Sequence, residues 1–450
     1  MMLVSNDTLK MSGSSKKSGE LFSRSIKVMP SGYTRHMIVQ NPYPLYASHA
    51  EGAWIWDVDG NKRIDFINNF TCLIHGHGRK EIVDIVQKQA SQLMSAIMPS
   101  EWEVQLAELL CERVPSVERV RFMNSGTEAV MVAVKAARAY TGRPKMAKME
   151  GGYHGQYDLI ESSFSPLPEQ WGAKEQPLTV ANNVGTPQSL LDEVLVLPIN
   201  DIEATTALIN NNAEKLSCIL IDPFRTHLAN IEPSVDYLQV LRDLTKKHGI
   251  VLIFDEVMSL RVGYNGRQGQ VGVTPDLTTM GKIIGGGLPV GALGGSKEVM
   301  SVFDIDEGNP KVKHSGTFTA NPMSMAAGYV GMSLMTEKAF DRLNNLGDRL
   351  ASGVNAAIND SGINAFIYGS GGVFSVSMLS EPPKNYRHYF SMCTSNMMNK
   401  AARFQQLLSE QGVLAMRGLF VCSTAMTNED IDFTIAACTK VLHRMADESH

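Results

Sequence analysis

The stretch Gly249-Ile-Val-Leu-Ile-Phe-Asp-Glu256 decides the fold class of this 450-residue chain. Its apolar, β-branched run is typical of a strand that is buried on both faces of a parallel sheet. Short apolar runs and segments of helical periodicity alternate on either side of it. Strands are expected at 120–123, 145–149 and 216–221, and helices at 128–140 and 235–247. This alternation predicts an α/β domain with a parallel sheet.

The two ends of the chain predict a second, smaller unit. Two short apolar segments within 53–67 are joined by turn residues and favour a hairpin. A long amphipathic helix over 339–358 is followed by strand-like and helical segments, which indicates an α+β unit. The expected organisation is a flexible N-terminal arm (1–20), an N-terminal segment of a small domain (21–75), a large ligand-binding domain (76–330) and a C-terminal small domain (331–450).

Composition excludes several functional classes. Lys and Arg total 41 against 46 Asp and Glu, a net charge of −5, so the basic footprint of a nucleic-acid binder is absent. No apolar run approaches the roughly 18–20 residues that span a bilayer. Six cysteines lack CxxC spacing, which favours free thiols in a reducing compartment. We therefore expect a cytoplasmic enzyme that binds neither nucleic acid nor membrane.

Polar residues follow the expected strands, where open α/β sheets bind their ligands. Asn124-Ser-Gly-Thr-Glu128 lies between a strand and a helix, and the free N–H groups of a helix start can hold a phosphate. An ordinary helix cap explains the same residues. Asp255 ends the central strand and could hold a cation, orient a base or pair with a protonated ring nitrogen.

Two further segments carry reactive or stacking side chains. Lys282 stands between an apolar stretch and the glycines 285–287, where burial would lower its pKa and make it a nucleophile toward carbonyls. Tyr153 and His154 lie on the glycine-rich turn 151–155 and could stack on a planar ligand. A solvated lysine and a plain loop are the alternative interpretations.

Other nucleotide and metal sites fit less well. Gly281-Lys282 is followed by Ile283 and lacks the upstream glycine of a phosphate-binding GxxxxGK[ST] loop, and no GxGxxG is present. His75 and His77 have no accompanying carboxylate or cysteine cluster, so no metal is expected. Taken together, a phosphate cradle, a stacking aromatic ring, a carboxylate and an amine nucleophile are the groups that pyridoxal 5'-phosphate requires.

Residues from about 24 to 445 resemble the class III pyridoxal-phosphate aminotransferases of fold type I. The similarity is strongest to glutamate-1-semialdehyde 2,1-aminomutase and to the β-amino-acid (β-phenylalanine-type) aminotransferases. Six stretches carry it in one order: Phe122-Met-Asn-Ser-Gly-Thr-Glu-Ala129, Glu150-Gly-Gly-Tyr-His-Gly155, Phe254-Asp-Glu-Val-Met258, Gly272-Val-Thr-Pro-Asp-Leu277, Gly281-Lys-Ile-Ile-Gly-Gly-Gly-Leu-Pro-Val-Gly291, and His314-Ser-Gly-Thr-Phe318 followed by Asn321-Pro322.

The resemblance implies a large domain with a mostly parallel seven-stranded sheet flanked by helices, and a smaller α+β domain built from the N- and C-terminal segments. It implies a ping-pong transaminase that uses a small-molecule amino donor and an oxo acceptor. It also implies a homodimer with shared active sites.

The resemblance further implies a role for each matching residue. Lys282 is expected to form a Schiff base with the cofactor and to move protons, and Asp255 to pair with the pyridine nitrogen. The other expected cofactor contacts are Ser125, Gly126 and Thr127 at the phosphate, Thr317 of a neighbouring subunit completing that site, Tyr153 on the ring with His154 nearby, and Val257 on the opposite face of the ring.

Two departures from the family pattern bear on function. The family's Glu-Pro is Asp222-Pro223 here, with a shorter carboxylate. Arg417 stands where the aminomutase has a glutamate and the β-amino-acid aminotransferases have an arginine. Arg35 also matches a substrate-carboxylate position in those aminotransferases, and a guanidinium fork suits a carboxylate. Surface arginines are the alternative interpretation of both.

These residues are compatible with three functions. The leading hypothesis is a transaminase acting on an amino acid, possibly a β-amino acid, or an amine. The first alternative is an aminomutase that moves the amine within one molecule. The second is a protein that binds the cofactor without catalysis, which the pairing of Lys282 with Asp255 disfavours.

Overall fold

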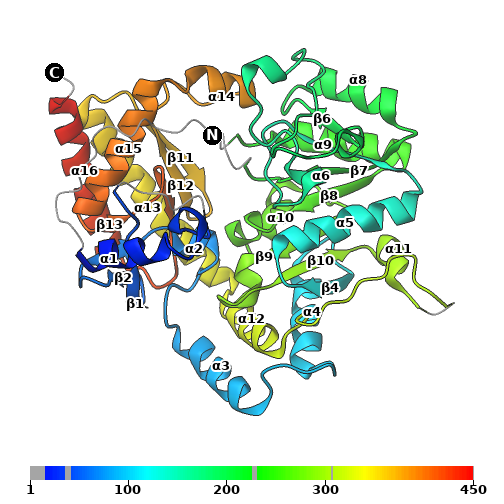
Figure 1. Ribbon diagram of the computed structural model, residues 1–450, viewed down its shortest axis with the longest axis horizontal. Coiled ribbons are helices and arrows are strands. Elements are labelled where there is room, and N and C mark those ends of the chain that lie inside the picture. The colour runs from blue at the N-terminus through cyan, green and yellow to red at the C-terminus, as the bar shows by residue number, and fades with distance from the viewer. Residues whose placement is uncertain (1–15, 36–41, 226–230, 306–307, 449–450) are drawn as a thin grey trace. The chain divides into compact units, whose positions relative to one another are not determined.

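A computed structural model describes residues 16–35, 42–225, 231–305 and 308–448 (Figure 1). Contacts divide the chain into two compact units, which are described separately. The large unit comprises residues 80–340 and 382–391, and the small unit comprises the described parts of 1–79, 341–381 and 392–450. Within the described ranges, no helix combines the length and the apolar character that crossing a bilayer requires.

The large unit is built on a seven-stranded sheet in the order β4-β10-β9-β8-β7-β5-β6. Only β10 runs antiparallel to its neighbours; the other strand pairs are parallel. The strands are β4 (Arg119–Met123), β5 (Lys145–Met149), β6 (Val194–Leu197), β7 (Leu216–Ile221), β8 (Val251–Asp255), β9 (Leu277–Gly281) and β10 (Gly291–Gly295). The prediction of an α/β fold with a mostly parallel seven-stranded sheet is confirmed.

Helices of this unit connect and cover the strands. They are α3 (Lys80–Gln92), α4 (Glu101–Arg113), α5 (Gly126–Thr141), α6 (Asp158–Glu161), α7 (Gln188–Leu191), α8 (Ile202–Asn212), α9 (Val235–His248), α10 (Gly266–Val271), α11 (Lys297–Met300), α12 (Pro322–Leu334) and most of α14 (Tyr386–Met392).

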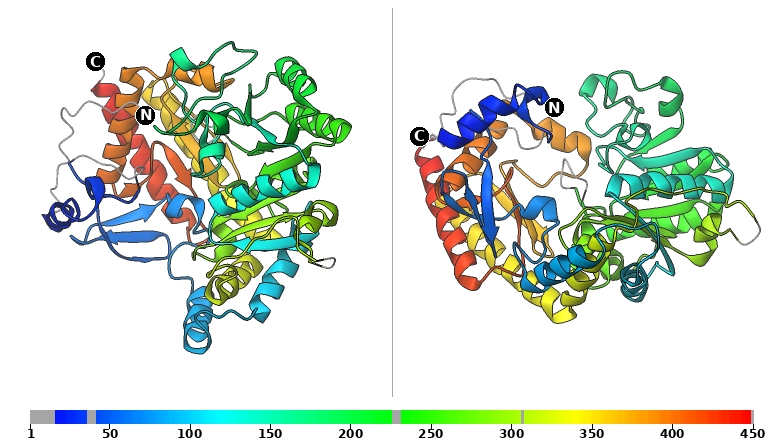
Figure 2. Two further views of the ribbon diagram at one scale, coloured as in Figure 1. Left: turned by 45° about the vertical axis from the view of Figure 1, so that its right-hand side comes forward. Right: turned by 60° about the horizontal axis from the view of Figure 1, so that its bottom comes forward.

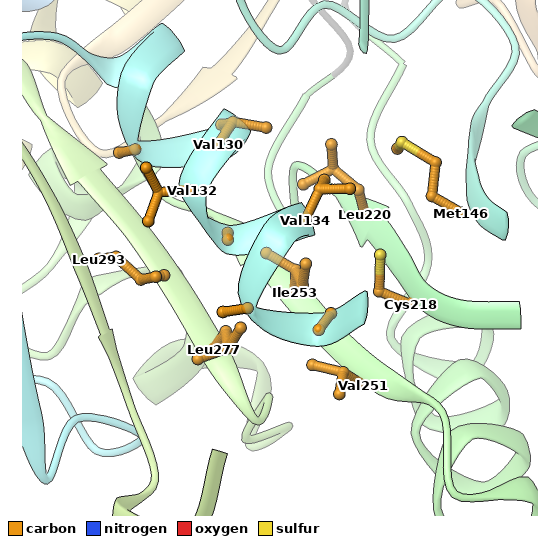
Figure 3. Packing of buried hydrophobic residues seen from close by; sticks show 14 of the residues in the cluster. Val130, Val132, Val134, Met146, Cys218, Leu220, Val251, Ile253, Leu277 and Leu293 are labelled. Atoms are coloured by element: carbon orange, nitrogen blue, oxygen red, sulfur yellow. The ribbon is translucent and has the colours of Figure 1, made fainter. Parts of the chain in front are cut away.

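The core explains why the central strands are apolar throughout. Alternate residues of a strand point to opposite faces. Leu220 and Ile253 therefore face the valines of α5 (Figure 3), whereas Ile219 and Leu252 belong to the cluster with α8 and α9. Because both faces are covered, neither shows the polar alternation of a half-exposed sheet.

The small unit combines two sheets with long helices. Its sheets have the orders β1-β2-β3-β13 and β11-β12-β14, and the expected hairpin is the antiparallel pair β2–β3. The elements are α1 (Lys16–Ser25), β1 (Ala47–Glu51), β2 (Trp54–Asp57), β3 (Lys62–Asp65), α2 (Asn68–Thr71), most of α13 (Glu337–Ser361), β11 (Phe366–Ser370), β12 (Val373–Ser377), α15 (Ser395–Glu410), β13 (Val413–Leu414), β14 (Leu419–Val421) and α16 (Asn428–Asp447). Both views of Figure 2 show orange α15 beside red α16, in agreement with their contacts.

Three elements differ from what the sequence pattern suggests. Helix α1 covers Lys16–Ser25 and so overlaps the expected arm, and the Asp59 carboxylate accepts the N–H groups of Lys17 and Ser18; residues 1–15 of that arm lie outside the described part of the chain. Strand β10 contains three glycines and was not among the expected strands. Its glycines are needed because a Cβ on Gly291 would lie 2.0 Å from the carbonyl oxygen of Ser125.

The third is α2, a turn of left-handed backbone. All four of its residues have positive φ, from 47° at Asn68 to 76° at Thr71. For L-amino acids this conformation costs roughly 1–2 kcal/mol per residue, and asparagine tolerates it best. The surrounding residues must therefore stabilise the turn.

Candidate active site

Three polar residues lie at or directly after the ends of neighbouring parallel strands of the large unit. Asp255 ends β8, Asp222 follows β7 and Lys282 follows β9. The pairings Ile221–Phe254 and Asp255–Thr279 bring these strand ends to one edge of the sheet. The sequence expectation that Asp255 and Lys282 lie at the carboxyl edge is met by this geometry.

Asp255 is buried and held in place by three donors. Its Oδ2 lies 2.8 Å from His154 Nδ1, and its Oδ1 accepts from the hydroxyl of Thr279 at 3.0 Å and from the backbone N–H of Val257 at 3.2 Å. Burial lowers the pKa of the His154 imidazole, although the neighbouring Asp255 opposes this effect. The carboxylate is thereby fixed in orientation without a full opposing charge.

The start of α5 has the geometry of an anion site. Ser125 is its N-cap, and the side-chain oxygen accepts from the N–H of Glu128 at 3.2 Å. Within a helix, the N–H groups of Gly126 and Thr127 have no partner, and the helix dipole places positive charge there. The cap interpretation and the phosphate interpretation of these residues are thus compatible.

Glycines at this position allow close packing around the helix start. A Cβ on Gly126 would lie 2.9 Å from Val257 Cγ1, and one on Gly155 would lie 2.5 Å from the Thr127 hydroxyl. A Cβ on Gly281, the residue before Lys282, would lie 3.4 Å from Val257 Cγ1. The residues expected at the phosphate, at the ring face and at the reactive lysine therefore converge.

Lys282 is half-buried and adopts a backbone φ of 50°. Positive φ is strained for a residue with a Cβ atom and is often found where function fixes the conformation. The strand end and the glycines after it, Gly286 and Gly287, both with positive φ, impose a sharp bend here.

Asp222, which stands where the family has a longer glutamate, bonds to the backbone of its own turn. Its Oδ1 accepts the backbone N–H groups of Phe224 at 2.9 Å and Arg225 at 3.4 Å, so the side chain folds onto its own turn. Burial and the negative charge of Asp255 raise its pKa well above the usual value, and Lys282 opposes this.

Tyr153 lies on the glycine-rich turn before His154. Its ring centroid is 5.1 Å from that of Phe164, and burial raises the pKa of its hydroxyl. The hydroxyl stays protonated at neutral pH, so the ring contributes a neutral apolar face.

Two residues that support this turn were not found from the sequence. Lys148 is fully buried in β5, and its Nζ donates to the carbonyl oxygens of Gly152, Ile160 and Ser162 at 2.6–2.8 Å. Burial lowers the pKa of Lys148 to about 7. The available signal for it was a lysine between the apolar residues Ala147 and Met149 of the strand.

The second is Arg387 on α14. It pairs with the buried carboxylate of Glu150 at 3.0 Å and also donates to the carbonyl oxygens of Trp171, Gly172 and Ala173. These contacts join segments more than 200 residues apart in the chain, so no local pattern could have predicted them.

We expect Lys148→Met to lower the free energy of unfolding by about 3 kcal/mol or more, because each buried carbonyl left without a donor costs about 1–3 kcal/mol. Cofactor affinity should fall as well, since the turn that carries Tyr153 loses its support. Urea unfolding and cofactor titration measure the two effects. Lys145→Met, at the partly buried start of the same strand, is the matched control; its Nζ donates to a single carbonyl oxygen, that of Asp192, so it should change stability less. Equal stability of the two variants would contradict the prediction.

The remaining expected site residues lie elsewhere. Thr317 is exposed in the large unit. Arg35 and Arg417 are both exposed and belong to the small unit. Arg35 Nη1 donates to Asn69 Oδ1 at 2.9 Å, and Arg417 has a φ of 51° before Gly418.

These groups fit a phosphorylated pyridine aldehyde. The buried His154 Nε2 has no hydrogen-bond partner among the described residues, and a Cβ on Gly126 would collide with Val257 at the helix start. Ser125, Gly126 and Thr127 are suited to a phosphate, Asp255 to a protonated ring nitrogen and Lys282 to an aldehyde carbon. The large unit is accordingly that of a pyridoxal 5'-phosphate enzyme of fold type I.

The family model for "Aminotransferase class-III" matches residues 37–439. The chain belongs to the class III aminotransferases, and it is a pyridoxal-phosphate-dependent transaminase. The predictions of family, cofactor and enzyme class are confirmed.

Individual relatives agree with this assignment. A glutamate-1-semialdehyde 2,1-aminomutase 2 of Halalkalibacterium halodurans is 36% identical, over 96% of this chain and 99% of its own. An omega-transaminase from Sphaerobacter thermophilus is 44% identical, with a TM-score of 0.92 over 96% of this chain and 98% of its own.

Two further solved structures are informative. One is described as a transaminase with PLP bound; it is 37% identical, with a TM-score of 0.87 over 96% of this chain and 98% of its own. The other is a β-phenylalanine aminotransferase from Variovorax paradoxus, 32% identical, with a TM-score of 0.83 over 94% of this chain and 93% of its own.

Proposed function

We propose that this transaminase takes a carboxylate-bearing amino acid, such as a β-amino acid, as one substrate and an α-keto acid as acceptor. The observation that carries this proposal is the guanidinium of Arg417, exposed on a tight turn. The turn is fixed because Gly418 packs against the carbonyl oxygen of Val376, to which a Cβ would come within 2.2 Å. The similarity to a β-phenylalanine aminotransferase supports the same substrate class.

Each cofactor-site residue has a proposed task. Pyridoxal phosphate, when bound, supplies an aldehyde and an electron-withdrawing ring. Lys282 acts as nucleophile and moves a proton at the substrate carbon, and Asp255 holds the ring nitrogen protonated. Ser125, Gly126 and Thr127 bind the phosphate, while Tyr153 and Val257 contact the ring, with His154 orienting Asp255. Arg35 and Arg417 bind the substrate carboxylate.

The test is a half-reaction, in which the holoenzyme is mixed with single amino donors and the cofactor spectrum is followed as the amino group is taken up. We expect a β-amino acid to react and Arg417→Glu to raise its KM by about tenfold to a hundredfold, because a charge-assisted fork is lost and a like charge is added. Arg24→Glu, on the exposed end of α1, is the control. An unchanged KM in Arg417→Glu would refute the substrate role of Arg417.

The aminomutase is a second candidate, because curated relatives at 36% identity carry that name. Turnover of glutamate-1-semialdehyde to 5-aminolevulinate without an added acceptor distinguishes it from a transaminase. Arg417, in place of the glutamate expected in the mutase, favours the transaminase.

We also propose a homodimer. Met94, Ile97, Met98 and Phe318 have exposed fractions of 61–102%, and Asn321 Nδ2 donates to the carbonyl oxygen of Met94, which ties the two segments together. An apolar group of this kind marks an interaction surface. Thr317, next to Phe318, would then reach the phosphate of the second subunit. A cytoplasmic location is likewise proposed and is supported by the cysteine spacing.

Phe318→Asp should weaken self-association by at least about tenfold, since a buried unpaired charge costs several kcal/mol. Analytical ultracentrifugation measures the dissociation constant. Val235→Asp, at an exposed apolar residue in the first turn of α9, is the control and should leave association unchanged. A wild-type monomer at micromolar concentration would remove the proposal.

A further inference from the structure

The left-handed turn α2 is fixed by buried contacts. The Asp65 Oδ1 atom accepts the N–H groups of Ile67 at 2.8 Å and Asn68 at 3.0 Å. The side-chain amide of Asn68, which is fully buried, donates to the carbonyl oxygens of Asp65 and Val421. Asp65 Oδ2 in turn pairs with His77 Nε2 at 2.9 Å.

Such over-determined strain is typical of functional positions. The strained conformation therefore points to a function for the side chain that the turn presents. The side chain that it presents outward is that of Asn69, with a φ of 48°.

Asn69 holds one edge of a guanidinium. Its Oδ1 accepts from Arg35 Nη1 at 2.9 Å, across 34 residues of sequence. Arginine carries five N–H donors, so a carboxylate can still be bound by the remaining ones. The amide is neutral and orients Arg35 without cancelling its charge, whereas an aspartate at the same place would compete with a substrate carboxylate.

We infer that Asn69 is a positioning residue for substrate-carboxylate recognition, acting through Arg35. This inference rests on the proposed role of Arg35. The left-handed backbone at Asn69 orients its side-chain amide toward Arg35, and the hydrogen bond to this amide fixes the Arg35 guanidinium. The ordered guanidinium then lowers the KM for donors that carry a carboxylate.

Two variants test it. Asn69→Gly keeps the positive φ at no steric cost and removes the amide. Asn69→Asp keeps the shape and adds a competing charge. The substrates are 3-amino-3-phenylpropionate and 1-phenylpropylamine, which lacks the carboxylate; if the amine is not turned over, it is measured as a competitive inhibitor. Ser31→Gly, another exposed positive-φ position in the small unit, is the control.

We expect Asn69→Gly to raise the KM for the amino acid about fivefold to tenfold, with kcat within twofold, and Asn69→Asp to raise it further. The KM of the amine, or its inhibition constant where the amine is not turned over, should stay unchanged in both variants. In an Arg35→Ala background, Asn69→Gly should have no additional effect.

The outcomes separate the two proposals. If Arg35→Ala raises the KM of the amino acid but Asn69→Gly does not, or if Asn69→Gly still acts without Arg35, the role of Asn69 is overturned while that of Arg35 stands. If Arg35→Ala itself leaves the KM unchanged, both roles are overturned.

Discussion

Replacing Lys282 with alanine is expected to reduce kcat by at least about 10²–10⁴-fold, which is the range that a positioned proton-transfer group contributes. The reason is specific to this residue. Lys282 follows β9 at the edge of the sheet where Asp255 ends β8, and it is the only lysine of the six matching stretches. Steady-state rates at saturating cofactor measure the effect. In the wild type, borohydride reduction and peptide mapping should place the cofactor on Lys282.

Lys282→Arg is the matched variant, because it keeps the positive charge but a guanidinium is not deprotonated in proteins. It should be as impaired as Lys282→Ala. If alanine at this position retained activity within tenfold of the wild type, or if the label mapped to another lysine, the assignment of the nucleophile would be lost.

Replacing Asp255 with asparagine is expected to reduce kcat by about 10²–10³-fold, the scale measured when one preorganised electrostatic group is removed. The side chain keeps its size and its contacts with Thr279 and the N–H of Val257, but it no longer offers a negative charge to a ring nitrogen. Rapid-mixing measurements of the half-reaction report the loss directly.

The Asp255→Asn variant should still be labelled on Lys282 by borohydride, since the lysine is intact. That result separates a loss of ring activation from a loss of folding. Asp255→Glu retains the charge but shifts it by one methylene, and it should lie between the wild type and the asparagine variant. Full activity of Asp255→Asn would exclude the proposed charge pair.

The fold was predictable where the hydrophobic pattern of a segment alone determined its structure. The apolar run before Asp255 predicted a central parallel strand because a strand covered on both faces needs apolar side chains at every position. Glycine-rich β10 was missed, since Gly291 is needed for the close approach of Ser125, and Gly294 and Gly295 for that of Val117 and Leu277, contacts that the sequence does not reveal. Left-handed α2 was missed for the same reason, because Asp65 and Val421 stabilise it through tertiary contacts.

The candidate site could be proposed from the sequence as far as its residues carry local motifs. Ser125, Asp255 and Lys282 each lie in a strand-end segment with a distinctive composition. Lys148 and Arg387 lie outside the matching stretches, and most of their hydrogen bonds go to backbone carbonyl oxygens, which any sequence offers at every residue. Asn69 likewise becomes visible only through its contact with Arg35.

The positive φ at Lys282 has an evolutionary corollary. A duplicated copy of this chain that has lost its catalytic activity gains nothing from a lysine at this bend. Glycine or asparagine adopts the positive φ with less backbone strain. Non-catalytic descendants should therefore accumulate glycine or asparagine at position 282. Either residue at this position would indicate that catalysis has been lost.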